Sequence, residues 1–258
     1  MNLNLENQLF LVGGATSGLG KAIAYALIEE GAKIIVVARS AGKLADLQHE
    51  FPEQIEIVVG DLFESKTNAK IMAKIGTRKI TGALINAGGP PAMPAMKTTL
   101  GDWDNAYKSV VRWKIELTQL LVEKMIPQNY GRIVYVESVS VKHPIENLVL
   151  SNSMRLAIVG YVKTLSQEVA QYGITMNILG PGYHATQRIE NIFIKNSELK
   201  GVPVETIKSQ FVNQTKVGDI GNPKDFASLA LWFFSPQSRY ITGQTISVDG
   251  GLVQGTFG

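Results

Sequence analysis

The sequence predicts a doubly wound α/β fold, in which one parallel seven-stranded sheet is covered by helices in a single domain. Short β-branched runs alternate along the chain with longer segments of helical period. The runs are apolar on both faces, which is typical of parallel strands buried on both sides. The chain has 258 residues, of which 45% are hydrophobic, and it contains no linker-like tract. One large core in one domain is therefore expected over residues 1–258.

Seven short runs predict the strands, at residues 9–13, 33–38, 55–60, 82–85, 132–137, 174–179 and 244–248. The first helix follows the first strand and ends at Gly31. A second clear helix is predicted over residues 152–171, with Leu156, Val159, Leu165 and Val169 on one side. The segment 185–218 is polar and irregular in pattern. We expect it to form a lid over the site.

Composition excludes several classes of protein. The chain has no cysteine, so it can form no disulfide and no thiolate metal site, and no metal site is predicted. No run approaches the roughly 18 apolar residues that a membrane helix needs. The net charge of +3 is small, and the lysines are scattered among acids. We therefore expect a cytoplasmic protein with no membrane or nucleic-acid partner.

A glycine-rich turn links the first strand to the first helix. The turn reads Gly14-Ala15-Thr16-Ser17-Gly18-Leu19-Gly20. At this position glycines allow close backbone approach to a pyrophosphate, and the free amides of the helix face its charge. The turn therefore predicts a dinucleotide site formed by Gly14, Thr16, Ser17, Gly18, Leu19 and Gly20.

With further motifs in order, the whole chain resembles the short-chain dehydrogenase/reductase superfamily, and broadly its 3-oxoacyl-thioester reductases. The motifs are Asp61-Leu62 after the third strand, Asn86-Ala87-Gly88 after the fourth, Pro181-Gly182 with Thr186, and the carboxy-terminal segment 240–251. The resemblance implies a Rossmann-type fold. It also implies that Asp61 and Leu62 contact the adenine end of a nicotinamide cofactor. Asn86, Ala87, Gly88, Pro181, Gly182 and Thr186 are then expected along the rest of that cofactor.

The end of the second strand predicts the choice of cofactor. An acidic residue there would bind the adenosine ribose and repel a 2′-phosphate. This chain has Arg39 and Ser40 in that place. An arginine fork can pair with the phosphate. We expect NADP(H), with NAD(H) as the less favoured alternative.

The catalytic segment departs from the family pattern. Ser138 stands at the place of the family's catalytic serine, but Ser151 and Arg155 stand where the family has its tyrosine and lysine. Val110 stands where it has an asparagine. Serine is a far weaker acid than tyrosine, although Arg155 can still hold the ribose and stabilise an alkoxide. A different proton donor, or a lost activity, is expected.

Several nearby residues are candidate replacements for that donor. Lys142, in the loop after Ser138, and Tyr183, after Pro181-Gly182, are the first two candidates. His143 and His184 are weaker candidates, and Asn152 and Ser153 are candidate substrate contacts.

Two functions remain open from the sequence. The first is an NADP(H)-dependent carbonyl reductase or alcohol dehydrogenase with Ser138, Lys142, Ser151, Arg155 and Tyr183 at its catalytic centre. The second is a cofactor-binding sensor or interaction module that has lost its proton relay. The first is favoured because a sensor needs neither a substrate serine nor a lid. The family likeness and the apolar residues Ile158, Val162, Leu165, Trp232 and Phe233 also predict a homotetramer or homodimer.

Overall fold

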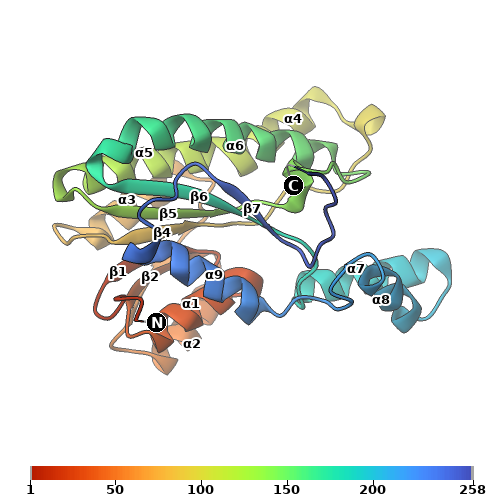
Figure 1. The fold of residues 1–258 in the computed structure, drawn as a ribbon, viewed down its shortest axis with the longest axis horizontal. Helices are drawn as coiled ribbons and strands as arrows, with labels where there is room; N and C mark the ends of the chain where they lie inside the picture. The colour runs from red at the N-terminus through yellow and green to blue at the C-terminus, as the bar shows by residue number, and fades with distance from the viewer. Residues whose placement is uncertain (1, 257–258) are drawn as a thin grey trace.

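The computed structural model describes residues 2–256 and forms three layers, helices on both faces of a parallel sheet (Figure 1). The sheet is seven-stranded, in the order β3-β2-β1-β4-β5-β6-β7, and every pairing is parallel. The strands are β1 (Leu9–Gly13), β2 (Lys33–Ala38), β3 (Ile55–Val59), β4 (Gly82–Ile85), β5 (Gly131–Val136), β6 (Ile174–Pro181) and β7 (Thr245–Val248). The predicted fold class is confirmed, with strand ends shifted by at most two residues.

The helices divide between the two faces of the sheet. In Figure 1, α1 (Gly18–Glu29), α2 (Ala41–Glu50) and α9 (Pro223–Phe234) lie below it. Above it lie α3 (Ser65–Ile75), α4 (Leu100–Ala106), α5 (Trp113–Met125) and α6 (Val149–Val169), with a π-helical segment at Tyr107–Arg112 between α4 and α5. No helix of residues 2–256 is long and apolar enough to cross a membrane.

Each face of the sheet has its own core. The upper core includes Ile35, Ile85 and Trp113, and the lower core includes Phe10, Leu27 and Phe234. Strand order reverses beside β1, between β2 and β4. In such sheets the crevice at the carboxyl ends of the strands, at this switch point, is where ligands bind.

Helix α6 starts at Val149 and ends at Val169, and most of its expected apolar side meets the core. Val169 is buried in the upper core, and Val159 and Leu165 pack against it. Leu156 of the same side is 45% exposed, and Ile158 and Val162, both at most 1% exposed, are buried in addition. Apolar residues occur on most sides of this helix, so the periodicity alone did not identify which side faces the sheet.

The segment predicted as an irregular insertion is largely helical. It forms α7 (Gln187–Lys200) and α8 (Val204–Val212), which project beyond the sheet in Figure 1. Its own small core consists of Ile189, Phe193 and Ile207. Because these few apolar residues are separated by many polar ones, the helical period was hard to see in the sequence.

Candidate active site

The glycine turn between β1 and α1 requires glycine at more than one place. Gly14 has φ +64°, and a Cβ there would lie 2.8 Å from Asn86 Nδ2. A Cβ on Gly20 would lie 2.3 Å from the carbonyl oxygen of Gly14. The Ser17 side chain makes no capping hydrogen bond to α1. Uncapped amides above a bare backbone form a cradle that fits the pyrophosphate of a dinucleotide.

Asn86 fixes the neighbouring strand end against this turn. Its Nδ2 donates to the carbonyl oxygen of Gly13 at 3.2 Å. Asn86, Ala87 and Gly88 all line the same cavity as the turn. The carboxyl ends of β1 and β4 therefore form one wall of the site.

The residues expected at the adenine end lie at the ends of β2 and β3. Arg39 is exposed and makes no ion pair within residues 2–256, and the Ser40 hydroxyl accepts from Lys43 N at the start of α2. Asp61 Oδ1 accepts from Phe63 N at 3.0 Å, while Leu62 is buried. None of these four residues lines the main cavity, which lies between the glycine turn and the segments after β4, β5 and β6. Thr16 also lies outside the lining.

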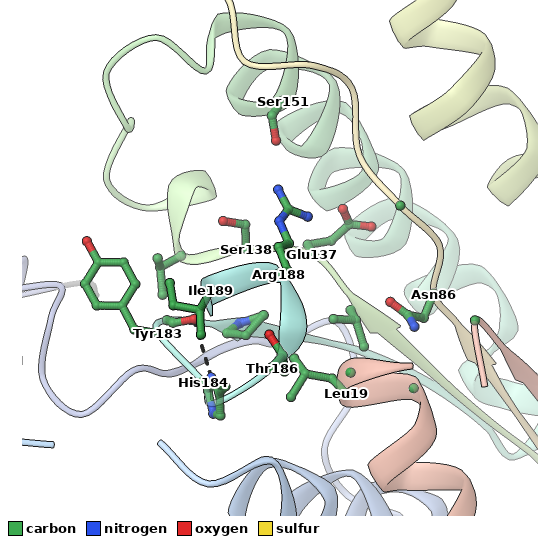
Figure 2. A pocket seen from close by; sticks show the side chains of 18 of the residues that line it. Leu19, Asn86, Glu137, Ser138, Ser151, Tyr183, His184, Thr186, Arg188 and Ile189 are labelled. Atoms are coloured by element: carbon green, nitrogen blue, oxygen red, sulfur yellow. Dashed lines mark hydrogen bonds between the residues drawn. The ribbon is translucent and has the colours of Figure 1, made fainter. Parts of the chain in front are cut away.

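The main cavity has a volume of about 370 Å³ and joins the dinucleotide turn to the expected catalytic residues (Figure 2). Ser138, Ser151 and Arg155 line it together with Pro181, Gly182 and Thr186. The Ser138 Oγ accepts from Ser140 N at 3.0 Å, so its own proton remains available to donate to a bound oxygen. The segments after β5 and β6, the first turns of α6 and the start of α7 thus meet in one place.

A buried ionic network underlies this cavity. Glu137 accepts hydrogen bonds from Lys114 through Oε1 and from Arg155 Nη1 through Oε2, the second at 2.8 Å. Arg155 also donates from Nε to Ser151 Oγ at 3.0 Å. Glu137 and Lys114 are each 3% exposed and Arg155 is 5% exposed. One carboxylate therefore holds two cations, one of which holds Ser151 in turn.

Burial lowers the pKa of Lys114 to about 8. Glu137 opposes this shift, while the nearby charge of Arg155 adds to it. A lysine with such a pKa keeps its proton at neutral pH and can release it to a stronger base.

Sequence reasoning missed both Lys114 and Glu137. Glu137 was assigned to the end of a buried strand without asking what would neutralise its carboxylate. Lys114 follows Trp113 in an apolar stretch of α5, directly after the π-helical segment. A charged residue within each of two apolar segments was the signal available, because buried charges need a partner. Val110, which the sequence predicts at the place of the family's asparagine, is buried in the upper core.

The expected proton donors lie in different surroundings. Tyr183 lines the cavity, its hydroxyl donates to Gln214 Oε1 at 2.9 Å, and burial raises its pKa. Lys142 and His143 follow Ser138 in the chain but are not among the residues that line the cavity. The structure therefore brings only Tyr183 of these three to the cavity.

The remaining candidates have contacts of their own. His184 lines the cavity but is 5% exposed, with its ring edge-on to Phe226, and burial lowers its pKa. Asn152 donates to the carbonyl oxygen of Ile145 at 2.9 Å. Neither Asn152 nor Ser153 lines the cavity. Packing accounts for these contacts of His184 and Asn152.

The family follows from a comparison of the whole chain with known proteins. Residues 14–253 match the profile described as enoyl-(acyl carrier protein) reductase, a short-chain dehydrogenase profile. The chain belongs to the short-chain dehydrogenase/reductase superfamily. The match extends from the glycine turn through the lid to the segment after β7.

Individual members of this superfamily align with nearly the whole of this chain. The chain is 28% identical to the 3-oxoacyl-(acyl-carrier-protein) reductase FabG of Vibrio cholerae, over 97% of this chain and 99% of the relative. It is 27% identical to the FabG of Aquifex aeolicus, over 98% and 100%. These relatives are reductases, and this chain is a short-chain oxidoreductase that uses a nicotinamide cofactor.

Solved structures show the same architecture. YwfH, described as an NADPH-dependent reductase involved in bacilysin biosynthesis, superposes with a TM-score of 0.90 at 25% identity, covering 97% of this chain and all of that one. L-sorbose reductase from Gluconobacter frateurii, solved with NADPH and L-sorbose, gives 0.93 at 21% identity, covering 99% and 100%. Because its identity is only 21%, the likeness to L-sorbose reductase shows the fold alone.

Proposed function

We propose that this protein is an NADP(H)-dependent oxidoreductase that reduces a carbonyl, or oxidises the corresponding alcohol, without the family's tyrosine. One observation carries the proposal: Ser138, Ser151 and Arg155 line the same cavity as the dinucleotide turn. When bound, NADPH supplies a hydride, and one proton completes the conversion of the carbonyl to an alcohol. The substrate class includes 3-oxoacyl compounds by analogy with the relatives.

We infer that Ser138 and Ser151, which line the same cavity, bind the carbonyl oxygen. Each hydroxyl oxygen already accepts a hydrogen bond, from Ser140 N and from Arg155 Nε respectively. Each hydroxyl proton is therefore left to point into the cavity. Two donors aimed at one oxygen stabilise the charge that develops there. Arg155 adds a fixed positive charge behind Ser151.

Glu137 holds Arg155 in this position. Its Oε2 binds Arg155 Nη1, and its Oε1 is occupied by Lys114. An arginine whose charge is shared with a buried carboxylate keeps one orientation, so that Nε faces Ser151. This arrangement substitutes for the family's tyrosine and lysine in binding and orientation, but arginine itself releases no proton.

The proton is proposed to reach the substrate oxygen through a group that lines the cavity. Tyr183 and Lys142 were the candidates from sequence, acting directly or through a water on Ser151. Tyr183 lines the cavity, whereas Lys142 does not. The Lys114–Glu137 pair adds a third candidate, since Lys114 has a pKa of about 8 and Glu137 lines the cavity. Tyr183→Phe, Lys142→Met and Lys114→Met separate the three, because only the true donor shifts the alkaline limb of the pH–rate profile.

The proposed choice of NADP(H) over NAD(H) rests on the end of β2. No acid stands there, and Arg39 is exposed with no ion pair in the described residues. A free guanidinium beside the adenosine site supports binding of a 2′-phosphate. The cradle of Gly14, Gly18 and Gly20 would hold the pyrophosphate, and Pro181, Gly182 and Thr186 the nicotinamide end.

We also propose that α7 and α8 form a lid and that the protein assembles as a homotetramer or homodimer. The residues that motivated assembly need correction, because Ile158, Val162 and Phe233 are buried within the subunit. Exposed apolar residues on adjoining elements replace them: Tyr107 is 48% exposed and Leu156 is 45% exposed. Exposed apolar side chains on two elements that contact each other support contact between copies of the chain.

The direct test is oxidation of NADPH, followed by its absorbance, across ketones, β-keto thioesters and quinones. Turnover of any carbonyl that falls sharply in Ser138→Ala supports the reductase. Binding of NADPH without turnover of any of them, and without an effect of Ser138→Ala, supports the sensor instead.

A further inference from the structure

The side chains that line the cavity carry more positive than negative charge. They are Glu137, Arg155 and Arg188. Both carboxylate oxygens of Glu137 are already used, one by Lys114 and the other by Arg155. No acid of the lining is left for Arg188, so this end of the cavity carries an excess of positive charge.

Arg188 lies in the first turn of α7, on the lid. Its guanidinium makes no hydrogen bond and no ion pair with any residue of the described range 2–256. The residue is exposed. Partial burial of its guanidinium and the charge of Arg155 both lower the pKa of Arg188. Two guanidinium groups close to each other, one of them without a carboxylate, favour an anion between them.

The direction in which the Arg188 side chain points indicates that its anion is not the pyrophosphate of the cofactor. Figure 2 shows Arg188 pointing from α7 toward Ser151 and Glu137, and away from Leu19 beside the glycine turn. The pyrophosphate already has the uncapped amides of α1 and the bare backbone of that turn. Arg188 therefore faces the substrate end of the cavity.

Apolar side chains also line the cavity. Ile145 and Leu148 line it from the segment before α6, and Ile189 and Ile192 line it from α7. A ligand that matches both Arg188 and these apolar side chains has an apolar body and one anionic group. Because Arg188 lines the same cavity as Ser138 and Ser151 and points toward Ser151 in Figure 2, that anionic group lies near the carbonyl.

We propose that Arg188 binds the carboxylate of the substrate, so that the protein acts on an apolar oxo acid. The guanidinium fork binds a carboxylate with two parallel hydrogen bonds, which fixes the orientation of the acid. Its carbonyl is then presented to Ser138 and Ser151. The identity of the substrate as an oxo acid rests on the proposed carbonyl reduction, whereas binding of a carboxylate does not.

The first experiment measures binding without reaction. Hexanoate and hexanamide, which have the same apolar body, are titrated calorimetrically into the protein saturated with NADP⁺. The wild type binds hexanoate more tightly than hexanamide. Arg188→Gln weakens hexanoate about ten- to a hundredfold, the usual effect of losing a charge-assisted pair, and leaves hexanamide and NADPH unchanged. Arg188→Lys retains part of the preference.

Lys195→Gln is the matched control, because Lys195 is an exposed cation on the same helix that does not line the cavity. It leaves the binding of hexanoate unchanged. Equal affinity of the wild type for hexanoate and hexanamide overturns the proposal. It is also overturned if Arg188→Gln weakens NADPH itself, since Arg188 would then contact the cofactor phosphates.

The second experiment compares turnover of free oxo acids of six to eight carbons with that of their methyl esters. The proposal requires a kcat/KM for the acids at least tenfold above that for the esters, and loss of this preference in Arg188→Gln. Equal turnover of acids and esters contradicts it. If neither is turned over while Arg188 still determines hexanoate binding, carbonyl reduction fails and the carboxylate site stands.

Discussion

The Nε of Arg155 donates to the Oγ of Ser151 at 3.0 Å, one helical turn away on α6. The sequence places these two residues where we expect the tyrosine and lysine of the superfamily, and their contact joins them in one hydrogen-bonded unit. Glu137 fixes Arg155 from the opposite side, through Nη1 at 2.8 Å. The altered site is therefore a connected hydrogen-bonded arrangement.

Arg39→Ala is expected to weaken NADPH about ten- to a hundredfold and leave NADH nearly unchanged. The reason is the loss of a charge-assisted contact to the 2′-phosphate, which contributes on the order of 1.5 to 3 kcal/mol. Fluorescence titration of both cofactors measures the effect. Lys33→Ala is the control, because Lys33 is exposed at the opposite end of β2. Equal affinity of the wild type for NADPH and NADH would exclude this role.

Glu137→Gln is expected to destabilise the protein more than Lys114→Met. Removing the carboxylate leaves Lys114 and Arg155 buried without a neutralising charge, which costs about 3 to 5 kcal/mol. Removing Lys114 leaves the Arg155–Glu137 pair balanced, so the cost is smaller. Urea unfolding of the two variants gives the comparison. A smaller loss for Glu137→Gln would show that the carboxylate does not hold the network together.

Stability is expected to rise with pH in a window set by Lys114. Its pKa is lowered in the folded protein from 10.5 to about 8, so above pH 8 the unfolded chain binds the extra proton. Stability therefore increases between about pH 8 and 10.5 because fewer protons are bound in the folded state. The free energy of unfolding of the wild type relative to Lys114→Met, measured across this window, reports the effect. A flat or falling difference contradicts a depressed pKa.

The protein is expected to form a dimer or tetramer, and Leu156→Glu is expected to shift it toward the single chain. Leu156 is 45% exposed on α6, so the substitution leaves the subunit core intact while placing a charge at the proposed interface. Light scattering at micromolar concentration measures the mass. A wild-type mass equal to that of one chain would contradict the proposed dimer or tetramer.

The fold was predictable because its signals are local. Apolar runs such as Leu9–Gly13 mark strands, and the glycine turn marks the start of α1. The spacing of Ser138, Ser151 and Arg155 predicted that they share a site, and all three line one cavity. Lys114, Glu137 and Arg188 were not, since their importance depends on which groups the folded chain places beside them. The exposure of Leu156 on α6 was not predicted for a related reason, because tertiary packing decides which of several apolar sides of a helix is buried.

The most direct test of the account is the rate of NADPH oxidation with a carbonyl substrate in the wild type and in Ser151→Ala, Ser138→Ala and Arg155→Ala. The account predicts measurable turnover in the wild type. Each variant should lower kcat by about 10² to 10⁴, the usual loss when an oxyanion donor or a proton-transfer group is removed, with NADPH affinity preserved in the two serine variants. An NADPH-saturated wild type that reduces no carbonyl, or turnover that is the same in all three variants, would contradict it.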